Sequence, residues 1–513
     1  MDSIRIKNIR SIVDSGDIHL SSINILLGKN SSGKSSFLRL FPMLKESARN
    51  ELRGPILWFD ENYDFGSFSN TFSRHASIGD DEMTLSFTWK HVSDRRASRM
   101  FYSSVAFIES NLDEADRISV SISIGRQRDE IILKSIDIAV DDLHINVKQQ
   151  GDGNLYDMEV NDRAIKIYNF EWNYGSTSLL PKIQIVSERS VYDNLVNSIR
   201  ELYGIDPMQL HSFYSTPQIK KLNEDAVWEY VETILLKSKR KKNVKKKDQE
   251  CSDRIIESVY LMYVNAILHF VDEDLTNYFR HTYYITPLRY NFLRYMRNRD
   301  LAVDYIESTG KNVMEYILSL KKTERENYIA YIKKTLKVNV DVEGKDNKSI
   351  FITTEDGERD NIVDVGYGFS QVLPIATTLW DRAYKRGEND LENTIVIEQP
   401  EVHLHPAMQK RLAILLVEAQ KIASNRGKRL VLIVETHSQH LVNQLGKYVA
   451  NSTVPEVKEL LDFYRTDKEI DAKISPEDIA IYLFNKNEGV TTITETKFGK
   501  DGMIENWPLG FLD

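Results

Sequence analysis

The sequence contains a single cysteine, Cys251, among its 513 residues. One cysteine excludes a disulfide within the chain and any metal site built from several cysteines, and it fits a reducing compartment. No apolar stretch approaches the roughly 20 residues that a membrane-spanning helix needs, so we expect no membrane contact. The N-terminus carries charges where a signal peptide needs an apolar stretch. We therefore expect a cytoplasmic protein.

Several sequence patterns that would indicate other protein classes are also missing. No long heptad of apolar residues is present, which argues against an extended coiled-coil arm, and no segment repeats at a fixed period. No HNH pattern is visible, and the residues after the last buried strand contain no acidic cluster of the two-metal type. We therefore do not expect this chain to cut nucleic acid itself.

The net charge of −9 excludes a polycation that coats nucleic acid, but the positive charge is unevenly distributed. Residues 237–247 form a basic loop that cannot pack in a core because its lysines repel one another. Two interpretations stay open for it: a solvated loop without a partner, or a contact with nucleic-acid phosphates. Its basic residues are Lys237, Lys239, Arg240, Lys241, Lys242, Lys245, Lys246 and Lys247.

The periodicity of apolar residues predicts an α/β protein with antiparallel and helical additions. Short strands are expected over residues 3–12 and 17–28. Apolar residues alternate with polar ones between about 83 and 185, which is typical of half-buried antiparallel strands. Between about 190 and 335 they recur at spacings of three and four, which is typical of helices.

These patterns predict three domains, whose boundaries follow from the changes in periodicity. Residues 1–186 form a first lobe with a glycine-rich loop and the antiparallel sheet. Residues 187–345 form a mostly helical insertion that includes the basic loop. Residues 346–513 form a second α/β lobe.

The glycine-rich loop GKNSSGKSS lies between the apolar run at 23–27 and an apolar helix. Its spacing and its place between strand and helix are those of a phosphate-binding loop. Glycines let backbone N–H groups converge on a triphosphate, which indicates ATP as the ligand. Lys34 would reach the β- and γ-phosphates, and the Ser35 hydroxyl would bind Mg²⁺. The candidate nucleotide-binding residues are Gly28, Lys29, Asn30, Ser31, Ser32, Gly33, Lys34, Ser35 and Ser36.

Two further segments are buried strands that end in polar residues. The run Ile395–Ile397 ends in Glu398, a carboxylate placed to hold Mg²⁺ or its water as a Walker B acid does. The second strand, Leu430–Val434, precedes His437, which can sense the γ-phosphate from the neighbouring strand. We therefore predict Ser35 and Glu398 as metal ligands and His437 as a catalytic residue.

A fourth segment, DVGYGFSQ, precedes an apolar helix and offers a second helix N-terminus for phosphate. On its own it is a weak signal, and a turn with a helix cap would explain it. Its place between the phosphate-binding loop and the acidic strand is that of an ABC signature segment. The residues predicted to act there are Gly366, Gly368, Ser370 and Gln371.

In this order, the four segments resemble the ABC-type ATPases of the SMC, RecF and OLD kind. The resemblance implies an ABC-type P-loop ATPase head that binds ATP with Mg²⁺ and forms a head-to-tail dimer or a higher oligomer. Each signature segment would contact the γ-phosphate bound by the opposite subunit. Arg10 falls where these relatives place a basic residue near the phosphates; an exposed turn arginine is the alternative.

Three more stretches narrow the resemblance. They are Pro287–Leu288–Arg289, the segment FDENYDFGSF after the first helix, and the tail KDGMIENWPLGFLD. With them the chain resembles the PtuA-type ATPases of Septu anti-phage systems, which also occur in some retron systems. That resemblance implies an associated HNH-type nuclease under the control of the ATPase. It leaves open nucleic acid as a further partner, including a retron reverse transcriptase with its RNA and DNA.

The sequence departs from the ABC pattern after Glu398, where Gln399 stands in place of the usual glutamate. A glutamine cannot accept a proton as a carboxylate does. Either Glu401 acts as the general base, or hydrolysis is slow and bound ATP acts as a long-lived switch, which is our hypothesis. His403 and His405 suggest a metal pair beside Glu401, but packing at a subunit interface explains them better.

Two other functions are compatible with these motifs. A RecF-like clamp in DNA repair would grip duplex DNA under ATP control, and basic residues on one face of a dimer would favour it. A nuclease of the OLD kind would show metal-dependent cleavage by this chain alone.

Overall fold

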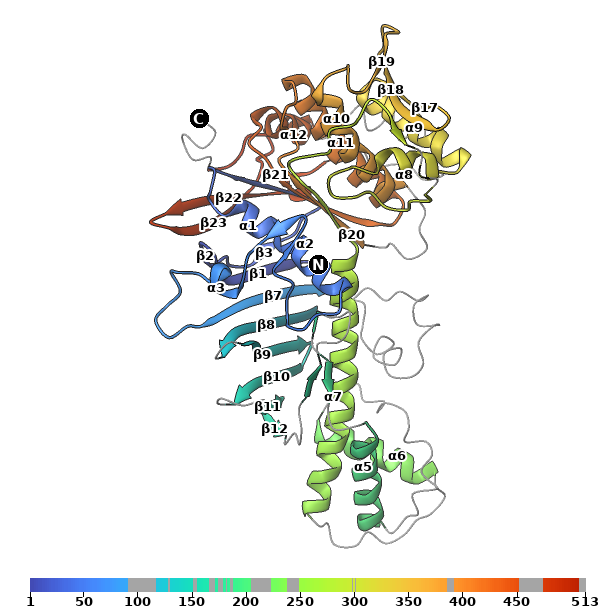
Figure 1. Ribbon diagram of the computed structural model, residues 1–513. Coiled ribbons are helices and arrows are strands. Elements are labelled where there is room, and N and C mark those ends of the chain that lie inside the picture. The colour runs from blue at the N-terminus through green and yellow to red at the C-terminus, as the bar shows by residue number, and fades with distance from the viewer. Residues whose placement is uncertain are drawn as a thin grey trace.

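The computed structural model describes residues 1–90, 117–127, 130–150, 155–165, 171–173, 179–180, 182–184, 188–203, 223–237, 249–297, 299, 301–384, 392–451 and 474–506. Figure 1 shows two stacked sheets, with helices above the upper one and a helical projection below. Most of the basic loop and the Trp-Pro tail lie outside the described residues, as does the predicted boundary at 186–187.

A six-stranded sheet forms the centre of the molecule, with strands in the order β15-β20-β21-β4-β22-β23. Its first five strands are parallel and β23 is antiparallel to β22. The strands are β15 (Thr282–Ile285), β20 (Glu392–Glu398), β21 (Arg429–Glu435), β4 (Ile23–Gly28), β22 (Ile479–Asn487) and β23 (Val490–Thr496).

This sheet separates two hydrophobic cores, because successive side chains of a strand point to opposite faces. Ile25 and Leu27 of β4 pack into one core and Leu26 into the other. The helices α1 (Lys34–Leu38) and α2 (Leu40–Arg49) cover the face of Leu26. The opposite face is covered by α10 (Tyr367–Tyr384), α11 (Pro406–Asn425) and α12 (Gln439–Asn451).

The second sheet is antiparallel and has nine strands, which are drawn as arrows below the central sheet in Figure 1. Buried isoleucine and valine alternate with more exposed serine along β8, as the sequence predicts. The strands are β1 (Ser3–Ile9), β2 (Ile12–Asp14), β3 (Ile18–His19), β7 (Glu82–Lys90), β8 (Arg117–Gln127), β9 (Glu130–Val140), β10 (Leu143–Gln150), β11 (Leu155–Val160) and β12 (Arg163–Ile165).

The N-terminal strands differ from the prediction of two strands over 3–12 and 17–28. Residues 3–28 contain four strands, divided between the two sheets. Asn8 and Arg10 have φ angles of 57° and 52°, so the chain turns where one strand was expected. Asn24 bonds the backbone of Ser21 and marks the turn into β4.

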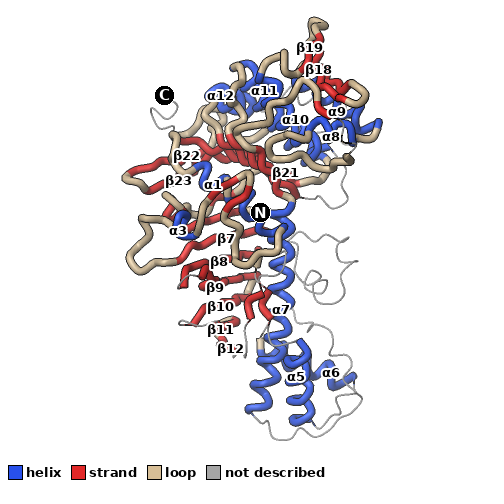
Figure 2. The backbone as a smooth tube through the Cα atoms, viewed as in Figure 1, coloured by secondary structure: helices blue, strands red, loops and turns tan. Residues whose placement is uncertain are grey.

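The helical insertion projects below the sheets in Figure 2. It consists of α5 (Glu188–Tyr203), α6 (Glu224–Lys237) and α7 (Gln249–Arg280). The helix α7 joins the insertion to the central sheet: its lower part packs with α5, and its C-terminal end leads into β15. The predicted helical domain 187–345 therefore also supplies a strand to the central sheet.

One helix differs from the expectation that no apolar stretch is long enough to cross a membrane. The helix α7 has the required length and composition, but 67% of its most apolar stretch is buried inside the protein. Val259, Ile267 and Phe279 are among its core residues. Its apolar character is therefore accounted for by packing between the antiparallel sheet and α5.

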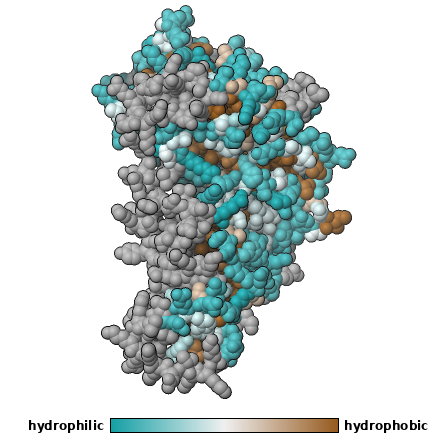
Figure 3. All heavy atoms as spheres, turned by 180° about the vertical axis from the view of Figure 1, so that it is seen from behind, coloured by the Kyte–Doolittle hydropathy of each residue, from teal (hydrophilic) through white to brown (hydrophobic). Residues whose placement is uncertain are grey.

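The remaining elements surround the helices of the upper lobe. The helices α8 (Val313–Ser319) and α9 (Lys322–Leu336) pack beside a small sheet of β16 (Met296–Arg297), β17 (Asn339–Glu343), β18 (Asn347–Thr353) and β19 (Arg359–Asn361). Figure 3 shows hydrophobic residues among the hydrophilic ones on the upper half of the molecule. The other short elements are β5 (Phe59–Asp60), β6 (Tyr63–Asp64), α3 (Phe68–Thr71), β13 (Glu171–Asn173), β14 (Lys182–Gln184) and a 3₁₀ turn at Pro476–Asp478.

The predicted fold class is confirmed: an α/β head with an antiparallel β lobe and inserted helices. All five parallel strands run in the same direction, so their carboxyl ends lie along one edge of the central sheet. Ligands of such sheets bind outside the carboxyl ends of the strands. The functional site is therefore expected at this edge, where the glycine-rich loop begins.

Candidate nucleotide-binding site

The glycine-rich loop connects the end of β4 to the start of α1, as predicted. Gly28 has to be a glycine because a Cβ there would lie 2.4 Å from the carbonyl oxygen of Phe484. Gly33 has a φ of 104°, which side chains rarely adopt. Thr491 of β23 donates a hydrogen bond of 2.8 Å to the carbonyl of Ser32 and fixes the loop from its other side.

Lys34 and Ser35 lie at the first turn of α1, where they face the loop. The ammonium of Lys34 donates to the carbonyls of Gly28 and Lys29, at 2.8 and 2.9 Å. Burial lowers the pKa of Lys34, and the nearby carboxylate of Glu435 opposes that effect. Its ammonium is therefore held inside the loop, where a triphosphate would offer stronger acceptors than two carbonyls.

Glu435 is a member of this site that sequence reasoning missed. Its carboxylate accepts a hydrogen bond of 3.1 Å from the Ser35 hydroxyl and lies 3.7 Å from the Lys34 ammonium. Burial raises the pKa of Glu435 to about 7, although Lys34 acts in the opposite direction. Glu435 could have been predicted from the sequence, because it ends the same buried strand that precedes His437.

Glu398 ends β20, as predicted, but its carboxylate is directed to partners other than Ser35. Arg39 donates to it at 3.0 and 3.3 Å, and the Tyr284 hydroxyl donates to Oε2. The Arg289 guanidinium donates to its backbone carbonyl at 3.0 Å. In the part of the chain that the structure describes, no hydrogen bond joins Glu398 to Ser35, the other predicted metal ligand, although the charge of Glu398 raises the pKa values of the nearby Lys34 and Glu435.

The other predicted catalytic residues gather at the ends of β20 and β21. The backbone N–H of Gln399 donates to the Glu435 carbonyl at 3.0 Å. Glu401 accepts a hydrogen bond of 2.5 Å from the backbone N–H of His437. Burial raises the pKa of Glu401 and lowers that of His437, to which the Lys34 charge also contributes. Both shifts favour the uncharged forms of the two side chains.

A cavity of about 290 Å³ lies over the loop. It is lined by Gln399 and Glu435 and by the cations Arg10, Lys34 and Lys486. Arg10 therefore lines the cavity, with its guanidinium 4.6 Å from the Phe65 ring. Lys486, on β22, was not predicted because nothing in its local sequence marks it. The other lining residues are Ser11, Asn30, Ser31, Ser32, Gly33, Ser35 and Ser36.

The signature-like segment lies apart from this cavity within one subunit. The helix α10 begins at Tyr367, so Gly368, Ser370 and Gln371 belong to its first turns and do not precede it. Ser370 and Gln371 are buried, whereas Gly366 is exposed. None of the four lines the cavity over the loop.

The residues present fit ATP and Mg²⁺. Within the described residues, buried polar atoms without a hydrogen-bond partner include Ser32 Oγ, Glu401 Oε2 and His437 Nε2. Buried polar atoms normally have partners, so a cluster of orphans beside a phosphate-binding loop indicates a polar ligand. Mg²⁺ is usually held by one or two protein oxygens together with substrate phosphates and water. The Ser35 hydroxyl and one carboxylate meet that requirement.

The histidines after β20 occupy an exposed turn. His405 caps the N-terminus of α11 by accepting from the backbone N–H of Ala407 at 3.3 Å. His403 is exposed and has a φ of 61°. In the part of the chain that the structure describes, no group of three or more His, Cys, Asp or Glu side chains could hold a metal ion.

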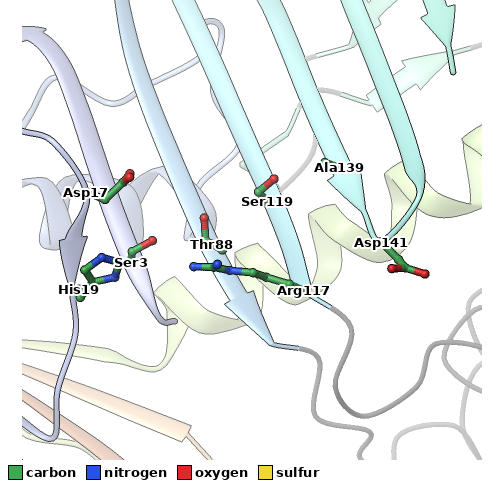
Figure 4. Close-up of a pocket in the computed structure, with 8 residues that line it drawn as sticks. All are labelled: Ser3, Asp17, His19, Thr88, Arg117, Ser119, Ala139 and Asp141. Carbon is green, nitrogen blue, oxygen red and sulfur yellow. The ribbon is translucent and has the colours of Figure 1, made fainter. Parts of the chain in front are cut away.

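A second cavity, of about 610 Å³, lies on a face of the antiparallel sheet away from the loop. Figure 4 shows the charged or titratable residues Asp17, His19, Arg117 and Asp141 among those that line it. Its lining mixes charges of both signs and contains no residue that the sequence predicted for function. The cavity with the predicted chemistry is the one over the glycine-rich loop.

Comparison with known proteins agrees with this assignment. Residues 1–442 match the family model described as AAA ATPase domain. Residues 474–513 match a family described as Protein of unknown function (DUF3696). No curated protein matches the chain.

Three solved structures of SMC heads are similar to the chain at low scores. One is the SMC head bound to the C-terminal winged-helix domain of ScpA, with 10% identity, 97% of this chain and 98% of that chain covered, and a TM-score of 0.36. The SMC head domain from Thermotoga maritima has 9% identity, coverages of 96% and 97%, and a TM-score of 0.34. The head with an extended coiled coil bound to the C-terminal domain of ScpA, from Pyrococcus furiosus, has 10% identity, coverages of 97% and 96%, and a TM-score of 0.34.

Proposed function

The chain belongs to the AAA ATPase domain family, and from that premise we propose that it is the ATP-binding and ATP-hydrolysing subunit of an anti-phage defence complex. In this proposal it dimerises around ATP and Mg²⁺ and controls an associated HNH-type nuclease. The observation that carries the ATP site is the cavity over the loop, with the buried Lys34 and the orphan atoms of Ser32 and His437. The defence role is carried by the resemblance of the motifs to PtuA-type ATPases.

The arrangement within one subunit favours a composite site. The cavity over the loop contains cations and hydroxyls for a triphosphate, but none of the signature-like residues. A head-to-tail pair would place Gly366 and Gly368 of one copy over the phosphates held by the other. ATP would then be part of the interface, and its loss or hydrolysis would loosen the dimer.

The polar side chains that follow β20, where the γ-phosphate would lie, favour slow hydrolysis of ATP. Gln399 lines the cavity but carries no carboxylate, and Glu401 is held by the His437 backbone. A general base contributes about 10²- to 10⁴-fold in rate. Without one, the ATP-bound dimer would persist long enough to act as a switch for a bound nuclease.

The decisive experiment is purification of the tagged chain from its native host, followed by mass spectrometry of bound proteins. Recovery of a small HNH-type protein with the parent chain, dependent on ATP, is the expected result. ATP binding without any nuclease partner, together with salt-sensitive binding of duplex DNA, would instead favour the RecF-like clamp. Absence of ATP binding would contradict both functions.

A further inference from the structure

A buried arginine follows the edge strand of the central sheet, and the proposed function gives it no role. Arg289 comes four residues after the end of β15, which pairs in parallel with β20. The Thr286 hydroxyl closes the intervening turn by donating to the Leu288 carbonyl at 2.8 Å. On the other side, the backbone N–H of Tyr290 donates to the Thr309 carbonyl at 2.9 Å. The backbone is therefore fixed on both sides of Arg289, and its side chain is buried, with the residue only 5% exposed.

The guanidinium of Arg289 binds the chain where β20 ends. Its Nη2 donates to the carbonyl of Glu398 at 3.0 Å and to that of Gln399 at 3.4 Å. These carbonyls belong to the two peptide groups that flank the Cα of Gln399. Gln399 has a φ of 45°, a left-handed conformation that residues other than glycine adopt only at a cost. Such a conformation persists where the surroundings hold it, and Arg289 contacts both of its peptide groups.

The residue held in this way lies at the nucleotide cavity. Gln399 lines that cavity, and its backbone N–H donates to the Glu435 carbonyl at 3.0 Å. The turn is thus held from β15 on one side and from β21 on the other. A glutamine beside the γ-phosphate orients the attacking water without having to accept its proton.

The other donors of Arg289 indicate that packing alone does not explain its burial. Burial lowers the pKa of Arg289 to about 10, which leaves the guanidinium charged at neutral pH. Among the described residues, its Nε and Nη1 have no hydrogen-bond partner, and neither has Oε2 of Glu401, the carboxylate whose charge attracts the guanidinium. A buried charge with unused donors is costly. A purely structural position would therefore favour an apolar side chain.

We propose that Arg289 is a positioning residue for ATP hydrolysis, which holds the turn at Gln399 so that the Gln399 side chain orients the attacking water. This rests on the proposed function, because it takes the cavity over the loop to be the ATP site. Arg289 itself contacts neither the nucleotide nor the water in this arrangement. Its loss should therefore affect the transition state more than the binding of ATP.

The test uses the full-length chain and separates binding from catalysis. Arg289→Ala removes both contacts to the end of β20, whereas Arg289→Lys keeps the charge without the planar fork. Arg53→Ala, at an exposed arginine, is the matched control. Gln399→Ala and the double variant with Arg289→Ala complete a double-mutant cycle.

Four measurements are made on each variant. Hydrolysis gives kcat and KM, and titration with a fluorescent ATP analogue gives the affinity for nucleotide. Binding of labelled ADP with orthovanadate, a mimic of the transferring phosphoryl group, reports complementarity to the transition state. Thermal melting checks that the variant folds.

In Arg289→Ala, kcat and the affinity for ADP with orthovanadate should both fall by about 10- to 100-fold, because misplacing a group by about 1 Å has effects of that size. KM and the affinity for the ATP analogue should stay within about 3-fold of the parent. Arg289→Lys should recover part of the loss, and Arg53→Ala should behave like the parent. Gln399→Ala should also lower kcat, and the double variant should be no slower than the slower single variant, because the two residues act as a unit.

Three results would overturn the proposal. They are a parent-like kcat in Arg289→Ala, a loss confined to KM, and losses that multiply in the double variant, which would mean that Arg289 acts independently of Gln399. If Arg289→Ala does not fold, Arg289→Lys takes its place in the cycle and is judged in the same way. Failure of the parent to bind the ATP analogue would instead overturn the proposed ATP site, so the two failures are distinguishable.

Discussion

At the scale of single residues, the site depends on charges placed where water is scarce. Lys34, Glu398 and Glu435 are at most 3% exposed, and each has at least one ionic or hydrogen-bonding partner. The identity of each partner determines what each charge can do. Changes of one residue at a time are therefore the sharpest tests of the site.

The first residue-scale prediction concerns Lys34. Lys34→Ala should weaken ATP binding by about 10- to 100-fold, because a charge-assisted contact to phosphate contributes about 1.5–3 kcal/mol. Lys322→Ala, an exposed lysine at the start of α9, is the matched control and should bind normally. Titration with a fluorescent ATP analogue measures both. Parent-like affinity of the Lys34 variant would exclude the loop as the nucleotide site.

The second concerns the missing carboxylate at Gln399. Gln399→Glu should raise steady-state phosphate release, by up to about 10²- to 10⁴-fold if a general base is what the parent lacks. Glu401→Gln should have a smaller effect than expected for a base, since Glu401 is bonded to the His437 backbone. Rapid hydrolysis in the parent that is abolished in Glu401→Gln and unaffected in Gln399→Glu would refute slow turnover.

The third concerns Lys45 on α2, whose ammonium donates to the Thr282 carbonyl at 2.6 Å. Burial lowers its pKa from 10.5 to about 8. Between these values the unfolded chain binds more protons than the folded one, so the folded state gains stability as pH rises from about 8 to 10.5.

The comparison variant is Lys45→Met, which lacks this titration. Relative to it, the parent should gain up to about 3 kcal/mol in free energy of unfolding across that interval. Urea denaturation of both proteins at pH 7.5, 9 and 10.5 measures the difference. A constant difference over this range would show that Lys45 is not buried as a charge.

At the scale of elements, the start of α10 does not line the nucleotide cavity of its own subunit. In the proposed dimer it would contact the nucleotide of the other copy. Ser370 is buried in that first turn, so a large residue there would disturb the fold. Gly368 is the better probe, because a Cβ at that position meets only Leu404, at an ordinary 3.7 Å. The helix N-terminus also accommodates an aspartate.

The element-scale prediction is that Gly368→Asp binds ATP like the parent but does not dimerise with it. The added carboxylate would repel the triphosphate held by the other copy. Gly54→Asp, where a Cβ meets nothing within 4 Å, is the control. Multi-angle light scattering with a non-hydrolysable ATP analogue measures the mass. A persistent ATP-dependent dimer of the Gly368 variant would contradict the composite site.

At the scale of the whole molecule, two stacked sheets carry the site at one edge and a helical insertion on the long helix α7. In this insertion, α6 ends at Lys237, which is also the first residue of the basic loop. The sequence of this loop favours a contact with nucleic-acid phosphates, because clustered lysines neutralise them.

The whole-molecule prediction is that neutralising the lysines between 239 and 247 weakens association with nucleic acid. The slope of log affinity against log salt should also become shallower, by about 0.9 for each phosphate of duplex DNA that the loop no longer neutralises. Fluorescence anisotropy at several salt concentrations measures it. An unchanged slope would exclude this loop from nucleic-acid binding.

The sequence by itself determined the local parts of this protein. The phosphate-binding loop was predictable because Gly28, Gly33, Lys34 and Ser35 are neighbours whose spacing has one physical use. The buried strands were predictable because a short run of β-branched residues such as Ile395–Ile397 favours a strand that is buried on both faces. The alternation in the antiparallel sheet followed from its period of two.

Only the tertiary structure decided which of these parts meet. Strand order puts β21 beside β4, and this brings the Glu435 carboxylate into hydrogen-bonding distance of the Ser35 hydroxyl. Thr491 and Lys486 are more than 400 residues away from the loop in the chain, yet both lie beside it in the structure. The sequence around them contains no pattern that predicts these contacts. The partner of a charged group depends on how strands are ordered in space, which short-range periodicity does not encode.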